Sequence, residues 1–167
     1  MKKTKEHWTA HIITLFPEMF PGPLEYSIIG KALKEKIWSL KLVNLQNFSK
    51  EGPKYIDDKP YGGGPGMIIK SEIVHKALKK ITKKIKNNYS LVYLTPKGNK
   101  LNQKKIKKFI KKDNLILVCG KYEGIDQRVI DAWKMEEIST GDYISSGGEI
   151  PAMILIDSCV RLLPNVL

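Results

Sequence analysis

An unbroken run of apolar residues, 115–119 (LILVC), constrains the fold of this 167-residue chain more than any other feature. A strand with one side facing solvent alternates apolar and polar residues, whereas a strand of a parallel sheet covered on both faces is apolar throughout. Gly120 follows the run directly and ends it. The run therefore predicts a central strand of a parallel sheet, buried between two layers of helices.

The rest of the chain alternates strand-like and helix-like patterns, as expected of an α/β domain with a mostly parallel sheet flanked by helices. A polar loop rich in glycine, proline and aspartate spans 46–66, and we find no internal repeat. The length suits one core, so we interpret residues 1–167 as one domain. Strands are predicted at 11–16, 40–45, 91–94 and 115–119, and helices at 24–37, 71–85, 102–111, 125–133 and 151–163.

Positive charge is concentrated in one part of the chain. The net charge is +12, and residues 76–112 contain fourteen lysines and no acidic residue. Such a segment favours a polyanionic partner, because each phosphate that a lysine neutralises releases counterions. Lysines at these spacings also form ordinary solvated helix surfaces, and the chain is rich in lysine, isoleucine and asparagine throughout. Charge alone leaves nucleic-acid binding and a plain solvated surface equally open.

Several classes of protein are disfavoured by the sequence. No apolar run approaches the roughly 20 residues of a membrane helix, and no apolar segment follows the basic start at residues 1–7, so no signal peptide is expected. Cys119 and Cys159 form no CxxC pair, and the three histidines lack metal-ligand spacing, so we expect no metal site. A cytoplasmic protein with no membrane partner is the expectation.

Three loops after strand-like runs carry glycine: 95–98, 120–124 and 140–148. In open α/β sheets ligands bind beyond the carboxyl ends of the strands, and glycine lets the backbone approach them closely. Three such loops in one small domain predict a shared pocket. The chain has neither a GxGxxG fingerprint nor a Gly-Lys-Ser/Thr phosphate loop, so dinucleotide and ATP sites are poorly supported.

The motifs in and around these loops resemble one known family. Residues 61–67 (YGGGPGM), 120–126 (GKYEGID) and 141–152 (GDYISSGGEIPA) look like the TrmD family of bacterial tRNA (guanine-N1)-methyltransferases. Residues 15–20 (LFPEMF) and 156–158 (IDS), the latter followed by Arg161, match it too. The resemblance runs in register from Ile12 to the last residue, and the five motifs occur in the order of the family.

The resemblance implies a fold, a cofactor and a substrate. The family belongs to the SPOUT methyltransferases, whose α/β domain ends in a deep trefoil knot, a feature nearly absent from other proteins. The expected enzyme is a tRNA (guanine(37)-N1)-methyltransferase: it binds S-adenosyl-L-methionine in the loops of the knot, acts as a homodimer, and methylates N1 of the guanosine directly 3′ of the tRNA anticodon.

Individual roles carry over to matching positions. Glu123 and Arg161 are the candidate catalytic residues: Glu123 near the cationic end of the cofactor, and Arg161 against the negative charge that develops on guanine O6. Asp57, Asp58 and Lys59 are expected to border the tRNA. The expected cofactor-binding residues are Pro96, Gly98, Gly120, Tyr122, Gly124, Thr140, Gly141, Asp142, Tyr143, Ile144, Ser145, Gly147 and Gly148.

The chain departs from the family in several respects, among them Lys59 where arginine is commoner, Thr140 where an aliphatic residue is expected, and a basic extension at residues 2–9. Asn165 stands where the family usually has glycine. The family also continues beyond the position of Leu167, through a linker that carries an aspartate general base, into a helical C-terminal domain. The resemblance thus implies that these 167 residues alone bind the cofactor but methylate tRNA poorly or not at all. Two alternatives stay open: a non-catalytic basic RNA-binding module, and a knotted methyltransferase with a different RNA target.

Overall fold

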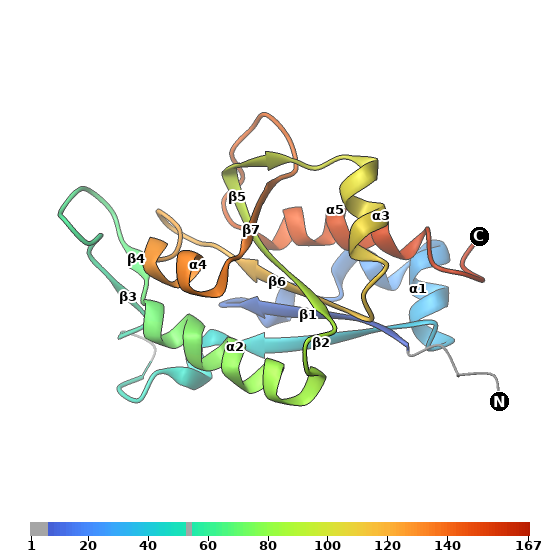
Figure 1. Cartoon of the computed structure of the whole chain (residues 1–167), viewed down its shortest axis with the longest axis horizontal. Coiled ribbons are helices and arrows are strands. Elements are labelled where there is room, and N and C mark those ends of the chain that lie inside the picture. Colours follow the sequence, from blue (N-terminus) through green and yellow to red (C-terminus); the bar gives the residue numbers. More distant parts are fainter. Residues whose placement is uncertain (1–6, 53–54) are drawn as a thin grey trace.

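A parallel sheet forms the centre of the computed structural model, which describes residues 7–52 and 55–167 (Figure 1). Its five strands lie in the order β2-β1-β6-β5-β7, and every neighbouring pair is parallel. The predicted α/β class is therefore confirmed. The basic start, residues 1–6, lies outside the described residues. The strands are β1 (Trp8–Thr14), β2 (Trp38–Asn44), β5 (Tyr89–Lys100), β6 (Asn114–Cys119) and β7 (Glu136–Ser139); β3 (Asp57–Asp58) and β4 (Ile68–Ile69) form a separate antiparallel pair.

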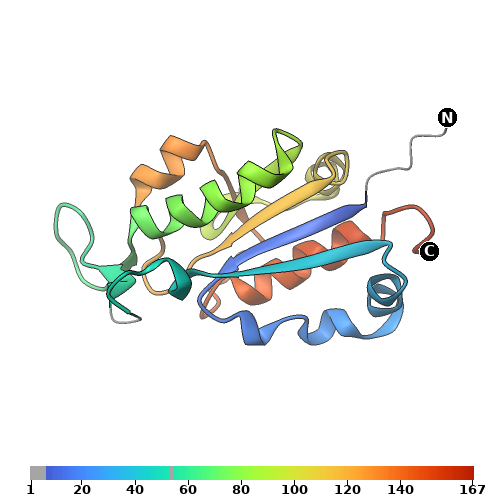
Figure 2. The same ribbon diagram turned by 90° about the horizontal axis from the view of Figure 1, so that it is seen from below.

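Helices cover both faces of the sheet, as Figure 2 shows from below. Side chains of α2 and α4 belong to one hydrophobic cluster and those of α1, α3 and α5 to another, with the sheet between the two. No helix in the described part of the chain is long and apolar enough to cross a bilayer. The helices are α1 (Ser27–Lys34), α2 (Ser71–Ile85), α3 (Gln103–Phe109), α4 (Gln127–Trp133) and α5 (Glu149–Val160).

Strand β6 has the two-sided burial that its apolar run predicts. Leu115, Leu117 and Cys119 point into the cluster that includes α5, whereas Ile116 and Val118 point into the cluster that includes α2. All five side chains are at most 1% exposed. The strand lies in the middle of the sheet, between β1 and β5. Its carboxyl end, directly before Gly120, therefore lies between β1 and β5.

The chain crosses itself where β5 meets the short edge strand β7. Ile138 is the register partner of both Leu94 and Asn99, so β5 bends around β7 between these two residues. Gly98 lies at the crossing, where an added Cβ would be 2.5 Å from backbone atoms of Glu137 and Ile138. Beyond β7 the chain returns to the centre of the sheet, where Gly148 N donates to Gly120 O at 2.9 Å. This path brings three loops to the same end of the sheet.

Candidate functional site

A cavity of about 390 Å³ opens at the carboxyl ends of β6 and β7 and at the bend of β5. It is formed by the three glycine-containing segments 95–98, 120–124 and 140–148, the first of which is the bend within β5 and not the predicted loop, together with neighbouring strand residues. The structure thus brings the three segments together at one pocket. Of the residues expected to bind the cofactor, those that line the cavity are Pro96, Gly120, Tyr122, Gly124, Thr140, Tyr143, Ile144, Ser145, Gly147 and Gly148.

The 120–124 loop is held in place by the β3–β4 hairpin. Ile69 N donates to Gly124 O at 3.0 Å, and Glu123 N donates to Met67 O at 3.0 Å. Gly124 has a φ of +112°, a conformation that glycine adopts without strain. A side chain at Gly66 would collide with that of Glu123. The YGGGPGM and GKYEGID motifs, far apart in sequence, are therefore in direct contact beside the cavity.

The 140–148 loop is braced by hydrogen bonds of its own. Ser139 Oγ donates to Gly141 O at 2.8 Å, Thr140 Oγ1 and Tyr143 Oη lie 3.2 Å apart, and Ser145 Oγ donates to Gly147 O at 2.8 Å. A Cβ at Gly141 would run into the ring of Tyr143, which lines the cavity. Gly141 itself is outside the lining, as are Gly98 and Asp142. Gly141 thus shapes the cavity through the ring above it.

Tyr93 lies at the base of the cavity, and the sequence analysis did not single it out. Tyr93 directly precedes Leu94, the last buried residue of β5, and is itself only 5% exposed. Gly120 and Gly124 are so close that a Cβ on either would be within 3.0 Å of the Tyr93 hydroxyl. Burial raises the pKa of Tyr93, partly offset by hydrogen bonds with Ile125 and Thr95. The side chain is therefore a neutral phenol against which two glycines pack.

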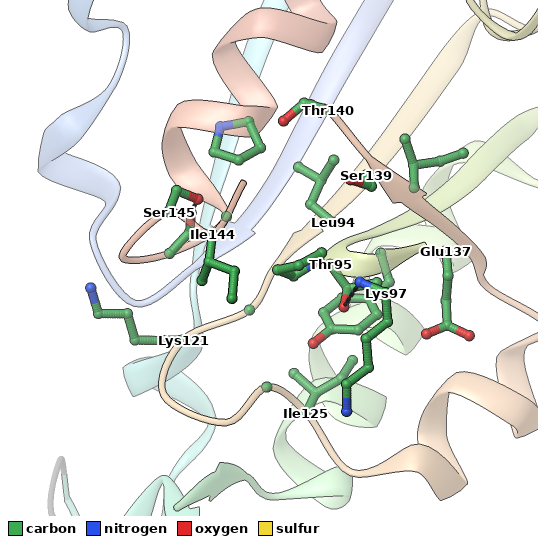
Figure 3. A pocket seen from close by; sticks show the side chains of 18 of the residues that line it. Leu94, Thr95, Lys97, Lys121, Ile125, Glu137, Ser139, Thr140, Ile144 and Ser145 are labelled. Atoms are coloured by element: carbon green, nitrogen blue, oxygen red, sulfur yellow. Dashed lines mark hydrogen bonds between the residues drawn. The ribbon is translucent and has the colours of Figure 1, made fainter. Parts of the chain in front are cut away.

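The cavity combines apolar walls with charged groups. Leu94 and Ile144 face it from opposite sides in Figure 3, and Ile144 is 85% exposed, so it stands at the mouth. Ile125, Ile130 and Ile138 extend the apolar surface. The carboxylates of Glu123 and Glu137 and the amines of Lys97 and Lys121 complete the lining. Such a site suits a ligand that has an apolar part and carries both a positive and a negative charge. In the described part of the chain, no three His, Cys, Asp or Glu side chains are grouped as metal ligands would be.

A buried carboxylate supports the cavity from behind. Glu149, in the first turn of α5, is 2% exposed, and its Oε1 accepts a hydrogen bond of 2.7 Å from Thr14 Oγ1. Thr14 Oγ1 also accepts from Phe16 N at 2.9 Å. A Cβ at Gly147 would be 2.5 Å from Glu149 Oε2. This contact fixes the end of β1 to the start of α5, directly behind the 140–148 loop.

Replacing Thr14 by valine should lower the free energy of unfolding by about 1–3 kcal/mol. The change keeps the shape but leaves the buried Glu149 carboxylate and the Phe16 amide without their partner. Urea denaturation followed by tryptophan fluorescence measures the effect. Thr14→Ser, which keeps the hydroxyl, is the control and should recover most of the stability. Equal midpoints for Thr14→Val and the unmodified protein would contradict a supporting role for this contact.

The remaining predicted residues lie outside the cavity. Arg161 follows the last residue of α5, whereas Gly148 and Pro151 at the first turn line the cavity. Arg161 is ten residues beyond Pro151, about 15 Å along the helix. Asp57 and Asp58 form β3 and pair with Ile69 and Ile68 of β4, and Lys59 N donates to Asp58 Oδ1 at 2.8 Å. Asp57, Asp58 and Lys59 therefore lie on the hairpin that braces Glu123.

Known proteins share both the sequence and the fold. The family model described as "tRNA (Guanine-1)-methyltransferase TrmD" matches residues 9–167. The curated tRNA (guanine-N(1)-)-methyltransferase of Ehrlichia canis (strain Jake) is 49% identical over 156 residues, which cover 93% of this chain and 66% of that protein. That of Wolbachia pipientis wMel is 47% identical over 155 residues, covering 93% and 65%. The chain thus spans about two thirds of the length of these relatives.

A solved structure completes the comparison. The crystal structure of tRNA (m1G37) methyltransferase from Aquifex aeolicus superposes with a TM-score of 0.85 at 37% identity, covering 96% of this chain and 72% of that one. This similarity confirms the expected SPOUT fold class. Sequence, fold and the placement of the motifs around one cavity agree: the chain belongs to the TrmD family of tRNA (guanine-N1)-methyltransferases.

Proposed function

We propose that this chain is a methyltransferase that acts on N1 of guanosine 37 in tRNA, directly 3′ of the anticodon. The observation that carries the proposal is the cavity at the bend of β5 and the carboxyl ends of β6 and β7, because the GKYEGID motif and the GDYISSGGEIPA motif both contribute to its wall. Relatives that match more than nine tenths of the chain are named tRNA (guanine-N(1)-)-methyltransferase, and the family model matches residues 9–167.

S-adenosyl-L-methionine is the methyl donor that fits the cavity best. The volume of about 390 Å³ lies in the range of roughly 300–1,000 Å³ typical of small-molecule sites. The apolar residues suit an adenine ring, the glycine backbone offers donors and acceptors for its edge, and Glu123 and Glu137 suit a cationic sulfonium and ammonium. When bound, this cofactor supplies a methyl group made electrophilic by the sulfonium. Lys97 and Lys121 are available for its carboxylate.

Arg161 has a role in the proposal that requires a second copy of the chain. Guanine N1 attacks a methyl group well only as its proton leaves, and the resulting negative charge spreads to O6. A guanidinium suits this charge, because it donates two parallel hydrogen bonds. Arg161 lies ten residues beyond Pro151, the last residue of α5 that lines the cavity, about 15 Å along the helix and farther than its side chain reaches. It therefore serves the cavity of a partner in a two-fold symmetric dimer.

An exposed apolar surface near the cavity is the proposed dimer contact. Ile150 and Ile154, one turn apart on α5, are 49% and 39% exposed, and Ile144 and Tyr143 of the adjoining loop are 85% and 54% exposed. Contiguous apolar groups on a surface commonly mark an interface. The surface includes both a wall of the cavity and the helix that ends at Arg161.

Light scattering at micromolar concentration should give the mass of two chains. Ile150→Glu together with Ile154→Glu should shift the mass to that of one chain, because four buried charges would face one another across the two-fold axis. Ile28→Glu is the control: Ile28 is a similarly exposed isoleucine, at 42%, on a different helix, α1. A single-chain mass for the unmodified protein would contradict the dimer.

A methyl-transfer assay tests the function itself. Single-turnover reactions with tritiated S-adenosyl-L-methionine would use an unmodified tRNA with guanosines at positions 36 and 37, and a matched tRNA with adenosine at 37. Label is expected only in the first. Calorimetry gives a readout without turnover, with one cofactor site expected per chain. Binding of tRNA without cofactor would favour a non-catalytic module, and label in both tRNAs would favour a different RNA target.

The proposed compartment is the cytoplasm, where such a tRNA is processed. Cys119 and Cys159 are both free and buried. Burial raises the pKa of the Cys119 thiol, with the Glu149 carboxylate adding to the rise, and burial raises that of Cys159 to about 12. Neither thiol forms a thiolate readily, so both behave as packing groups.

A further inference from the structure

The lysine-rich segment 76–112 is split into two surfaces by the fold. The buried side chains of α2 pack in the hydrophobic cluster on one face of the sheet, and those of α3 pack in the cluster on the other. Figure 1 shows the two helices on opposite sides of the molecule. The lysines of α2 and of α3 therefore cannot contact the same short stretch of a partner. Only one set can be placed for a substrate of the cavity.

The α3 set is continuous with the cavity. Lys97 lines the cavity, and Lys100 is the register partner of Ser139, which lines it too. Leu101 N then donates to Ser139 O at 2.8 Å, and Asn102 caps the first turn of α3. The basic positions from here on recur every three or four residues, so those on the helix share one side. We call this set the α3 track: Lys97, Lys100, Lys104, Lys107 and Lys111.

The charge of the α3 track is left for an external partner. Glu136 forms ion pairs with Lys105 at 2.7 Å and with Lys108 at 2.8 Å, and Lys105 is largely covered. None of the salt bridges found in the described part of the chain involves Lys104, Lys107 or Lys111, and all three are exposed. These three lysines line a shallow groove of about 790 Å³ in which Glu136 is the one acidic residue.

The lysines of α2 differ from the α3 track in their position relative to the cavity. Helix α2 begins beside the 120–124 loop, where Ile69 bonds to Gly124, and ends close to Tyr89, the first residue of β5. Its lysines at 79, 83 and 84 lie in the second half of the helix, which leads away from the 120–124 loop toward the amino ends of the strands, on the other face of the sheet from α3. They form a matched surface of similar charge without access to the site.

We propose that the α3 track holds the phosphate backbone of the RNA strand that enters the cavity. The proposal rests on the proposed function and adds the surface that receives the substrate. Lys104 and Lys107 lie on α3 and Lys111 lies in the turn that follows it, so the three form a short row of positive charge that can face neighbouring phosphates of one strand. Contacts with phosphates fix the position of the strand but do not read its bases, so the track adds affinity without choosing the methylated guanosine.

The test compares two triple variants that lose the same charge. One is Lys104→Gln, Lys107→Gln and Lys111→Gln, and the control is Lys79→Gln, Lys83→Gln and Lys84→Gln. Binding of unmodified tRNA is measured from about 50 to 200 mM salt. The α3 variant should lower the slope of log affinity against log salt by about 2–3, since each lost phosphate contact removes about 0.7–0.9. The control should leave the slope within about 0.5 of the unmodified protein.

Two further readouts separate the possible failures. Calorimetry with S-adenosyl-L-methionine should give the same affinity for both variants and the unmodified protein, which also shows that they fold. Mass spectrometry after amine acetylation of the unmodified protein should show Lys104, Lys107 and Lys111 protected by tRNA, and Lys79 and Lys83 unprotected. Equal slopes for both variants, or protection of α2 alone, would overturn the α3 track while leaving the proposed function intact. Absence of cofactor binding and of methyl transfer would overturn the proposed function instead.

Discussion

Gly98→Ala is expected to lower the free energy of unfolding by about 3 kcal/mol or more, the upper range for forcing extra atoms into a packed site. The new Cβ would lie 2.5 Å from the carbonyl carbon of Glu137 and the amide nitrogen of Ile138. These are backbone atoms of β7, and β7 cannot move aside because β5 bends around it. Gly98→Val should prevent stable folding. Urea denaturation followed by the fluorescence of Trp8, Trp38 and Trp133 measures the change.

The control for this prediction is Gly62→Ala. Gly62 has a φ of +89° and no atom near the position of an added Cβ, so alanine there meets backbone strain alone. That strain costs about 1–2 kcal/mol. If Gly98→Ala unfolded at the urea concentration of the unmodified protein but bound S-adenosyl-L-methionine weakly, Gly98 would act on the ligand, as the family resemblance implies, and not on the crossing.

The crossing is also the part of the fold that sequence patterns could not predict. The run at 115–119 predicted β6 because two-sided burial requires apolar residues throughout. Residues 136–139 (EEIS) have no such pattern, yet they form β7, because two stretches of β5 provide partners for them. Pro96 and Gly98 predicted the end of the strand at Leu94, whereas they mark the bend within a longer β5. A strand that forms because neighbouring segments offer hydrogen-bonding partners need not show a strand pattern in its own sequence.

The candidate site was predictable where it consists of loops and not where it consists of strand ends. Glycine and the family motifs pointed to Gly120, Gly124 and the 140–148 loop, which line the cavity. Tyr93 and Ile138 also line it, but each has the pattern of an ordinary buried strand residue. Asn165 illustrates a departure that the backbone explains: its φ is +67°, which favours the glycine of the family and which asparagine tolerates.

Gly141→Leu is expected to weaken S-adenosyl-L-methionine binding by about ten- to a hundredfold, the equivalent of about 1.4–3 kcal/mol of misfit. Gly141 packs directly beneath the ring of Tyr143, so any side chain displaces that ring from the wall of the cavity. The displacement also disturbs the contact between Thr140 and Tyr143. Isothermal titration calorimetry with the cofactor measures the change in affinity. Because Gly141 lies in a loop, the fold should persist, and thermal denaturation checks that it does.

Ser146→Leu provides the matched control, because it adds the same side chain to the same loop at an exposed position outside the cavity lining. Its cofactor affinity should stay within about twofold of the unmodified protein. Tyr143→Ala combined with Gly141→Leu gives a second check: with the ring removed, leucine no longer has it to displace, so the double variant should bind no worse than Tyr143→Ala alone. Undiminished affinity in Gly141→Leu would mean that the 140–148 loop does not contact the cofactor, and the assignment of the cavity to S-adenosyl-L-methionine would fail.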